Sequence, residues 1–329
     1  MQKTHPHRVA RRIETWFARH QRPLPWRDGY DPYRVWLSEI MLQQTRVDVV
    51  LPYFARFLER FPTVHALAAA SDDEVTSAWS GLGYYRRARM LRDGARVVVS
   101  QFDGVVPSTV EALLAIPGIG RYTAGAIASI AFERRAPIVD GNVARVVSRI
   151  FATDDDAWPI AQALVDTATS PRALNQGLME LGALLCTPRN PACLLCPARP
   201  DCIAANTGRV DEFPRPKPKK VTRELNIPLF IILDRKGRVL MRRETGDLMT
   251  GMYHLPHGNT SLLGGEALDA SGELLGVVKH TVTNRRIEFA VYRATLPRAP
   301  RGYEWIALSD LDALPHPSYV RKALRLANL

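Results

Sequence analysis

The spacing of apolar residues divides the chain into a long helical part and a shorter part with strands. From Arg8 to about Ala205, apolar residues recur three and four positions apart, which is the spacing of amphipathic helices. Strand-like alternation is scarce there, whereas Ser-x-x-Glu sequences that begin at Ser71 and Ser108 have the form of a capping box at a helix start. The pattern predicts an all-α first domain over residues 1–209.

The pattern changes after the last cysteine of the chain. Residues 213–220 are basic and interrupted by prolines, which is typical of an extended linker, and we expect that linker over residues 210–225. Its lysines could also follow a phosphate backbone. Beyond it the pattern predicts a smaller α+β second domain over residues 226–329, with strands at 227–233, 239–241 and 287–292 and a short helix at 319–326.

The net charge of the chain indicates which kind of partner it binds. The 329 residues carry a formal net charge of +11, which favours a polyanionic partner such as a phosphate backbone, although a merely arginine-rich surface is the alternative. The first residues lack the apolar core of a signal peptide, and no apolar run reaches the length of a membrane span. We therefore expect a cytoplasmic protein, associated with the nucleoid through DNA, without a membrane partner.

The cysteines point to a metal centre. All four lie within residues 186–202 with the spacing C-x6-C-x2-C-x5-C, at Cys186, Cys193, Cys196 and Cys202. In a reduced compartment such crowding favours a metal or cluster site over disulfides or buried free thiols. The spacing leaves zinc and an iron–sulfur cluster open. The loop between the first two cysteines holds Arg189 and Pro191 and could also touch DNA.

A glycine turn lies between two helical stretches at residues 116–124. Its sequence, Ile-Pro-Gly-Ile-Gly-Arg-Tyr-Thr-Ala, follows a helix that is expected from Ser108 and precedes a helix rich in small residues. Gly118 and Gly120 allow positive φ and close approach of another backbone, and the next helix starts with free N–H groups. This pattern indicates a helix-hairpin-helix, a sequence-independent grip on phosphates, although an ordinary helical corner is the alternative.

Two carboxylates are candidates for chemistry. Asp140 stands just ahead of a helix, where the helix dipole would keep it ionised, although a simple helix cap is the alternative. Glu39 shares a helix face with Trp36, Ile40 and Gln43, and desolvation in this stripe would raise its pKa toward that of a general acid. A surface glutamate is the alternative there.

These motifs, in this order, resemble the helix-hairpin-helix glycosylase superfamily that includes endonuclease III. Residues 36–45, the segment Gly-Leu-Gly-Tyr-Tyr at 81–85 and the second domain are similar to the MutY-type adenine DNA glycosylases. The resemblance implies a helix-hairpin-helix glycosylase domain with a cluster loop at 186–202 and a Nudix-like lesion-recognition domain. It also implies that the four cysteines bind a 4Fe-4S cluster.

The resemblance further implies a reaction. Glu39 would protonate adenine at N7, and Asp140 would stabilise the oxocarbenium-like sugar, with Tyr122 and Asn142 beside it. Bifunctional members carry a lysine where this chain has Tyr122, so a monofunctional glycosylase is expected.

Other positions are assigned to DNA by the same resemblance. Arg27 and Gln176 would line the adenine pocket, and Gln44 and Tyr84 would wedge into the duplex. For Arg27 a surface ion pair is the alternative, and for Tyr84 a place in the core.

The second domain departs from the family pattern. The family's Phe-Ser-His loop corresponds to Val282, Thr283 and Asn284, of which Thr283 and Asn284 keep hydrogen-bonding groups for lesion recognition. No Glu-rich Nudix box lies between His257 and Gly276, so pyrophosphatase activity is not expected. The implied partner is double-stranded DNA with adenine opposite 8-oxoguanine or guanine, bound by a monomer.

Two other readings stay open. The first is an endonuclease III-like glycosylase/lyase on oxidised pyrimidines, and Tyr122 and the second domain speak against it. The second is a non-catalytic iron–sulfur DNA-binding protein, and the presence of both Glu39 and Asp140 speaks against that.

Overall fold

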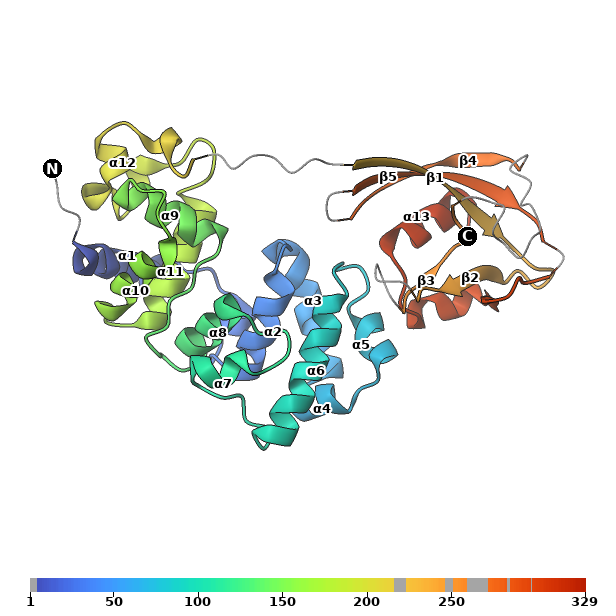
Figure 1. The fold of residues 1–329 in the computed structure, drawn as a ribbon, viewed down its shortest axis with the longest axis horizontal. Helices are drawn as coiled ribbons and strands as arrows, with labels where there is room; N and C mark the ends of the chain where they lie inside the picture. Colours follow the sequence, from blue (N-terminus) through green and yellow to red (C-terminus); the bar gives the residue numbers. More distant parts are fainter. Residues whose placement is uncertain (1–4, 216–222, 246–250, 259–271, 283–284, 297) are drawn as a thin grey trace. The chain divides into compact units, whose positions relative to one another are not determined.

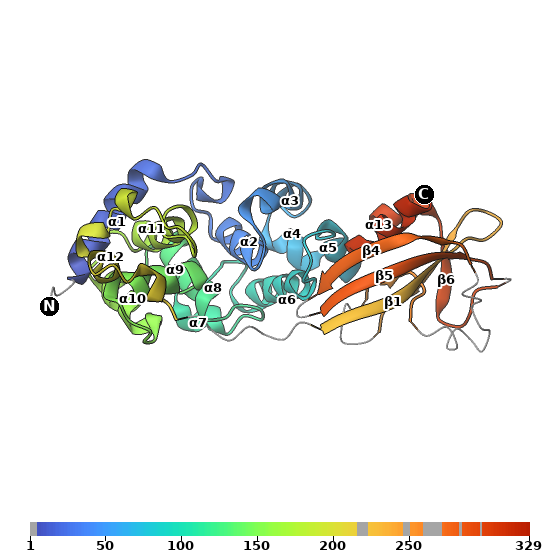
Figure 2. The same ribbon diagram turned by 90° about the horizontal axis from the view of Figure 1, so that it is seen from above.

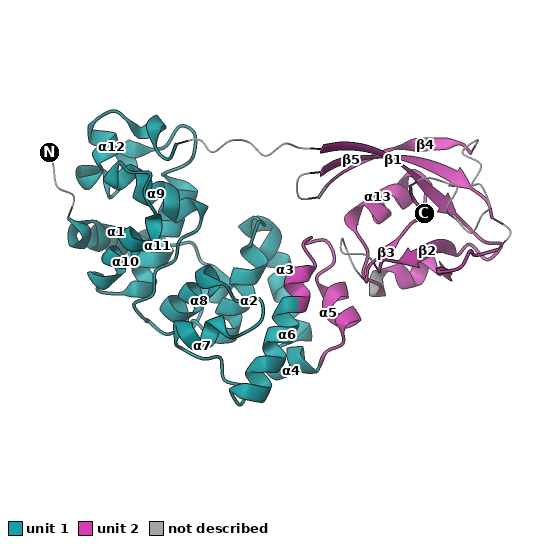
Figure 3. Cartoon of the chain, in the orientation of Figure 1, with its two compact units in different colours: residues 1–69, 90–217 teal, residues 70–89, 218–329 magenta. Residues whose placement is uncertain are grey.

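The chain divides into two units, each built from two separate stretches of the sequence. The computed structural model describes residues 5–215, 223–245, 251–258, 272–282, 285–296 and 298–329. One unit comprises residues 1–69 and 90–217, and the other comprises residues 70–89 and 218–329 (Figure 3). Residues 70–89 have the helical pattern of the first part of the sequence, yet they pack with the C-terminal residues.

The first unit is helical, as the apolar spacing predicts (Figures 1 and 2). Helix α6 (Arg86–Gln101) begins in the other unit and continues into this one. The remaining helices of the first unit are α1 (Pro6–His20), α2 (Pro32–Leu42), α3 (Val47–Arg60), α4 (Val64–Ala69), α7 (Val110–Leu114), α8 (Arg121–Ala126), α9 (Gly141–Phe151), α10 (Ala157–Asp166), α11 (Pro171–Leu184) and α12 (Ile203–Asn206).

Side-chain caps fix where several helices begin. The predicted capping box at Ser71 is confirmed, since its hydroxyl accepts from the Glu74 N–H while the Glu74 carboxylate accepts from the Ser71 N–H. The prediction for Ser108 is wrong by one residue. Thr109 caps α7 instead, accepting from the N–H of Ala112 at 3.3 Å. Either residue supplies the hydroxyl that such a position requires.

One core of the first unit holds α9 against α1, α10 and α11. Val143, Val146 and Val147 of α9 are buried in it together with Leu178 of α11 and Ile13 of α1. Since these valines bury one face of α9, the start of the helix and its cap Asp140 are left at the edge of this core. A smaller cluster joins α2 to α8 and the π-helical turn that follows α8.

The second unit combines two small sheets with helices. In one sheet β5 lies between β1 and β4, parallel to β1 and antiparallel to β4, and in the other β2 lies between β3 and β6. Helix α13 supplies Tyr319, Val320 and Leu324 to the core that both sheets share. The elements are α5 (Asp72–Ala78), β1 (Arg223–Ile232), β2 (Val239–Arg243), β3 (Tyr253–His254), β4 (Leu274–Val282), β5 (Arg285–Ala294), β6 (Tyr303–Ile306) and α13 (Ser318–Leu326).

The predicted strands at 227–233, 239–241 and 287–292 and the terminal helix are confirmed, with small shifts at their ends. Strand β4 has no counterpart among the predicted strands, because Gly276 interrupts it and Leu274 and Val277 are exposed, which obscures the alternation. Thr283 and Asn284 lie outside the described residues. Among the residues that are described, no helix has the length and apolar character needed to cross a membrane.

Candidate active site

Six residues that the sequence singles out line one pocket of the first unit. The pocket has a volume of about 880 Å³, within the range of ligand sites in proteins. Its walls come from α2, α8, α9 and α11 and from the segment before α2. The six are Arg27, Glu39, Tyr122, Asp140, Asn142 and Gln176. A neighbouring pocket shares Glu39, Tyr122 and Asp140 and adds Gln44 and Gly120.

Glu39 is a buried carboxyl group on α2, with 5% of its surface exposed. Tyr122 Oη donates to Glu39 Oε2 at 2.6 Å. The pKa of Glu39 is raised to about 7, mainly by burial. The Tyr122 hydrogen bond lowers this pKa, the charge of Asp140 raises it, and the charge of Arg27 lowers it. Glu39 can therefore carry a proton near neutral pH, which a general acid needs.

Tyr122 is a hydrogen-bond donor that keeps its proton. Burial raises the pKa of its phenol well above the usual value, and the charge and hydrogen bond of Glu39 act in the same direction. Tyr122 lies on α8, directly behind the glycine turn, so the turn and the acid carboxyl are connected through one short helix.

Asp140 caps α9 and is held by two donors. Its Oδ1 accepts from the Val143 N–H at 2.7 Å, and its Oδ2 accepts from Asn142 Nδ2 at 3.0 Å. Both the predicted cap and a carboxylate that faces the pocket are therefore present. Arg145 extends this network, because it donates to Asn142 Oδ1 at 2.9 Å and to the Cys186 carbonyl oxygen at 2.7 Å. Asp140 is thus connected to the cysteine loop through Asn142 and Arg145.

Arg27 packs against α11 with most of its side chain covered, so it is not part of a surface ion pair. It donates to Gln176 Oε1 at 2.9 Å and to Glu180 Oε2 at 3.1 Å, and 10% of its side chain is exposed. Burial raises the pKa of Glu180, but its hydrogen bonds and ion pairs with Arg22 and Arg27 outweigh burial and lower that pKa below its ordinary value. Arg27 and Gln176 are thereby fixed in orientation toward the pocket.

Sequence reasoning missed Glu180 and Arg145. Glu180 lies four positions after Gln176 on α11, so the two residues share one face of a helix that also supplies the core. A charged residue on that face could have indicated that Glu180 belongs to the site. Arg145 lies three positions after Asn142 on α9, which is the same kind of signal.

The two candidate wedge residues share an uncommon backbone conformation. Gln44 has a φ of 57° and Tyr84 a φ of 51°, in the left-handed region that is costly for residues other than glycine. Tyr84 is 43% exposed, so it is not a core residue. Strain of this kind concentrates at functional positions.

The two glycines of the turn differ in what they provide. Gly118 has a φ of +82°, and a Cβ there would lie 2.7 Å from the Cβ of Met90, so the fold itself requires glycine. Gly120 has a φ of −94°, and a Cβ there would meet no atom within 4 Å. Positive φ is therefore needed at Gly118 only, and Gly120 leaves open space beside the pocket that contains Glu39.

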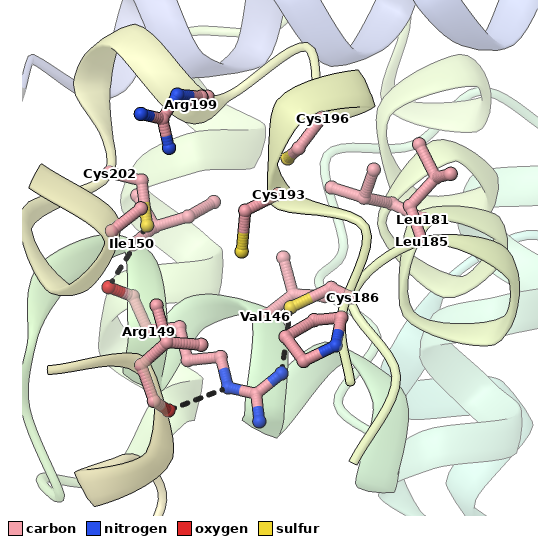
Figure 4. A pocket seen from close by; sticks show the side chains of 13 residues that line it. Val146, Arg149, Ile150, Leu181, Leu185, Cys186, Cys193, Cys196, Arg199 and Cys202 are labelled. Atoms are coloured by element: carbon pink, nitrogen blue, oxygen red, sulfur yellow. Dashed lines mark hydrogen bonds between the residues drawn. The ribbon is translucent and has the colours of Figure 1, made fainter. Parts of the chain in front are cut away.

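The cysteines surround one cavity (Figure 4). The buried Arg149 lies against it, donating to Cys186 Sγ at 3.4 Å and to the Thr187 carbonyl oxygen at 2.7 Å. Within the described residues, no three His, Cys, Asp or Glu side chains are grouped so that they could hold one metal ion. Four thiols around one cavity are a donor set that would hold an iron–sulfur cluster.

The helical unit has the fold of known DNA glycosylases. It is similar to a thermostable thymine-DNA glycosylase with a TM-score of 0.57 and 30% identity, over 61% of this chain and 97% of that chain. A trapped endonuclease III–DNA intermediate has a TM-score of 0.53 at 23% identity, over 61% of this chain and 95% of that chain, and it shares the fold. The family model described as HhH-GPD superfamily base excision DNA repair protein matches residues 37–166, and a NUDIX domain model matches residues 229–326. Fold and family models define a helix-hairpin-helix DNA glycosylase with a Nudix-like domain, as predicted.

Comparison with three mammalian relatives identifies the family within the DNA glycosylases. The mouse and human adenine DNA glycosylases are both 33% identical over 95% of this chain, which covers 76% and 72% of their lengths. The rat adenine DNA glycosylase is 45% identical over 62% of this chain, but the match spans 43% of that protein, less than half of its length. The chain belongs to the adenine DNA glycosylase family, and the predicted resemblance to MutY-type enzymes is confirmed.

Proposed function

We propose that this protein is a monofunctional glycosylase that removes adenine from duplex DNA in which the base lies opposite 8-oxoguanine or guanine. One observation carries the proposal. Glu39, whose pKa is raised to about 7, shares a pocket with the Asp140 carboxylate and is held by Tyr122. A proton-donating carboxyl group and a second carboxyl group in one pocket are the groups that glycosidic cleavage uses.

In the proposed reaction an adenine that is flipped out of the duplex enters the pocket. Glu39 gives its proton to N7 of the base. The C1′–N9 bond then breaks, and its electron pair leaves with the adenine. Asp140 stabilises the positive charge that develops on the sugar. Water adds to C1′ and loses a proton, so the products are free adenine and an abasic site.

The strand itself should stay intact after this reaction. Strand cleavage by β-elimination needs an amine that forms a Schiff base with the sugar. Tyr122 occupies the position of that amine in bifunctional relatives, and its raised pKa supports a role as a neutral donor to Glu39.

Contacts to the base and the duplex are assigned to four further residues. We assign Arg27 and Gln176 to the edge of the flipped adenine, since they lie side by side in the pocket. Gln44 and Tyr84 fill the space that the base leaves in the duplex, and their left-handed backbone supports this role.

A 4Fe-4S cluster is proposed on Cys186, Cys193, Cys196 and Cys202, which line one cavity. When bound, it would supply a cross-link that stiffens the loop from Cys186 to Cys202. The chain's own residues already hold this loop, since Arg145 and Arg149 bind carbonyl oxygens of Cys186 and Thr187. The domain limits that we propose remain 1–209, 210–225 and 226–329, with Thr283 and Asn284 of the last assigned to the base opposite adenine.

The test is a single-turnover assay on three duplexes, with adenine opposite 8-oxoguanine, guanine or thymine. Strand breaks are scored with and without alkali. We expect breaks only after alkali, fastest opposite 8-oxoguanine. Equal rates opposite 8-oxoguanine and guanine would contradict a preference for 8-oxoguanine. Breaks without alkali would indicate a lyase, and no adenine release from any duplex would overturn the proposal.

A further inference from the structure

The loop at residues 79–85, between α5 and α6, carries Tyr84 and is a strained segment of the second unit. Gly81, Gly83 and Tyr84 have φ values of 101°, 71° and 51°, so three of four consecutive residues lie in the left-handed region. Such a conformation persists only where surrounding contacts hold it. Residues 70–89, which include the loop, cluster with residues 218–329 (Figure 3).

Part of the support comes from within residues 70–89. Arg87 donates to the carbonyl oxygens of Leu82 at 3.3 Å and Gly83 at 3.1 Å. Its guanidinium lies 5.4 Å from the ring centroids of both Trp79 and Tyr84. Arg87 therefore ties the Tyr84 ring to the backbone of its own loop.

A second support comes from the C-terminal segment. Tyr85 Oη donates to the carbonyl oxygen of His316 at 2.9 Å and accepts from the Gly81 N–H at 3.2 Å. His316 is 2% exposed, and Arg321 on α13 donates to its Nε2 at 3.0 Å. The Tyr85 hydroxyl thus bridges the start of the loop and a buried residue that α13 holds.

An ion pair forms a third support. Asp73 on α5 pairs with Arg243 on β2, and Arg243 also donates to the Gly251 carbonyl oxygen at 3.2 Å. Asp72 on the same helix pairs with Arg89 at 3.1 Å, on the other side of the loop. Both ends of the loop are therefore anchored within the second unit.

We propose that the C-terminal domain positions the Tyr84 loop, in addition to reading the base opposite adenine. Tyr85 and Asp73 are the positioning residues, and His316 and Arg243 are their partners in the C-terminal domain. This inference rests on the proposed function, because Tyr84 acts there as the wedge in the duplex. Separation of the loop from the C-terminal domain leaves Tyr84 poorly placed to unstack the target.

The test uses the full-length chain with Tyr85→Phe, which removes one hydroxyl and little volume. Tyr33→Phe is the matched control, because Tyr33 Oη also donates to a buried backbone carbonyl, that of Phe61 at 2.9 Å, in the first unit. Unstacking is read from the fluorescence of 2-aminopurine placed next to the target adenine. The rate of adenine release is measured in a single turnover at saturating enzyme.

Tyr85→Phe is expected to lower both the fluorescence rise and the rate, by about tenfold for the rate, while Tyr33→Phe changes neither by more than about twofold. Asp73→Arg should act like Tyr85→Phe, and adding Arg243→Asp should restore both readouts. Wild-type readouts in Tyr85→Phe and Asp73→Arg, or failure of the charge swap to restore them, would overturn the inference. If the wild-type protein releases no adenine, the proposed function fails, whereas the fluorescence still tests the wedge.

Discussion

Tyr122 Oη lies 2.6 Å from Glu39 Oε2, and this hydrogen bond joins α8 to α2 inside the pocket. Helix α8 begins directly after Gly120, so the element that would grip the phosphate backbone also orients the acid carboxyl. Movement of the glycine turn would therefore shift Tyr122 and change the position of the Glu39 carboxyl group. The same contact opposes the effect of burial on the carboxyl group, because it lowers the pKa that burial raises.

Tyr122→Phe should change both the rate and the pH profile of adenine release. Because Glu39 must be protonated to act, the wild-type rate falls as the pH rises through about 7. Loss of the Tyr122 hydrogen bond raises the pKa of Glu39 further, so the falling limb moves to higher pH. The maximal rate drops by about tenfold because the carboxyl is less well oriented. Single-turnover rates from pH 5 to 9 check this, and a limb that stays in place or moves to lower pH contradicts it.

Glu39→Gln should stabilise the protein at high pH more than at low pH. The folded state raises the pKa of Glu39 from its ordinary value of 4.5 to about 7, so it binds the proton more tightly than the unfolded chain does. Wild-type stability from this group is complete below pH 4.5 and is lost as the pH rises to about 7, by at most about 1.4 kcal/mol per pH unit. Glutamine carries no such penalty. Urea unfolding of both proteins at pH 5 and pH 8 measures the difference, and a gain that is equal at both pH values argues against a raised pKa.

Gly118→Ala and Gly120→Ala should separate folding from DNA binding. Alanine at position 118 meets Met90 and a positive φ, so we expect a loss of roughly 1–3 kcal/mol in the free energy of unfolding. Alanine at position 120 meets no atom of the protein, so stability should hold. Its methyl group instead occupies the space for a phosphate, and DNA affinity should fall. Thermal unfolding and DNA titration of both variants check this. Normal DNA affinity in a stable Gly120→Ala protein would contradict the proposed contact between the glycine turn and a phosphate.

Glu180→Gln should destabilise the protein and weaken substrate binding together. The change leaves Arg27, with 10% of its side chain exposed, without its carboxylate partner and loosens its contact with Gln176. Breaking such a buried pair costs roughly 3 kcal/mol. We expect a lower urea midpoint and an increased KM for mispaired duplex. Asp201→Asn is the control, since it removes a buried carboxylate that pairs with Arg8 and Arg12 away from the pocket, and a KM that rises equally in both variants contradicts the assignment of Arg27.

Sequence reasoning found the residues whose motifs are contiguous and missed those that depend on packing. Glu39 and the cysteines stand in short patterns with a clear chemical meaning. Arg145 reaches the carbonyl oxygens of Gly182 and Cys186 only when α9 packs beside the end of α11. Glu180 gains Arg22 and Arg27 only when the segment before α2 packs against α11. The link between Tyr85 and His316 spans 231 positions, and no local pattern predicts such a contact. The predicted cap at Ser71 is confirmed, whereas at Ser108 the neighbouring hydroxyl of Thr109 takes the capping position instead.

Glu39 is the proposed acid that releases adenine. Free adenine is measured directly by chromatography after a single turnover on a duplex with adenine opposite 8-oxoguanine, for wild type and Glu39→Gln at equal DNA occupancy. We expect the wild type to release adenine and the variant to bind the same duplex but release it more slowly, by a factor on the order of 10²–10⁴. Release by Glu39→Gln at the wild-type rate would contradict the account.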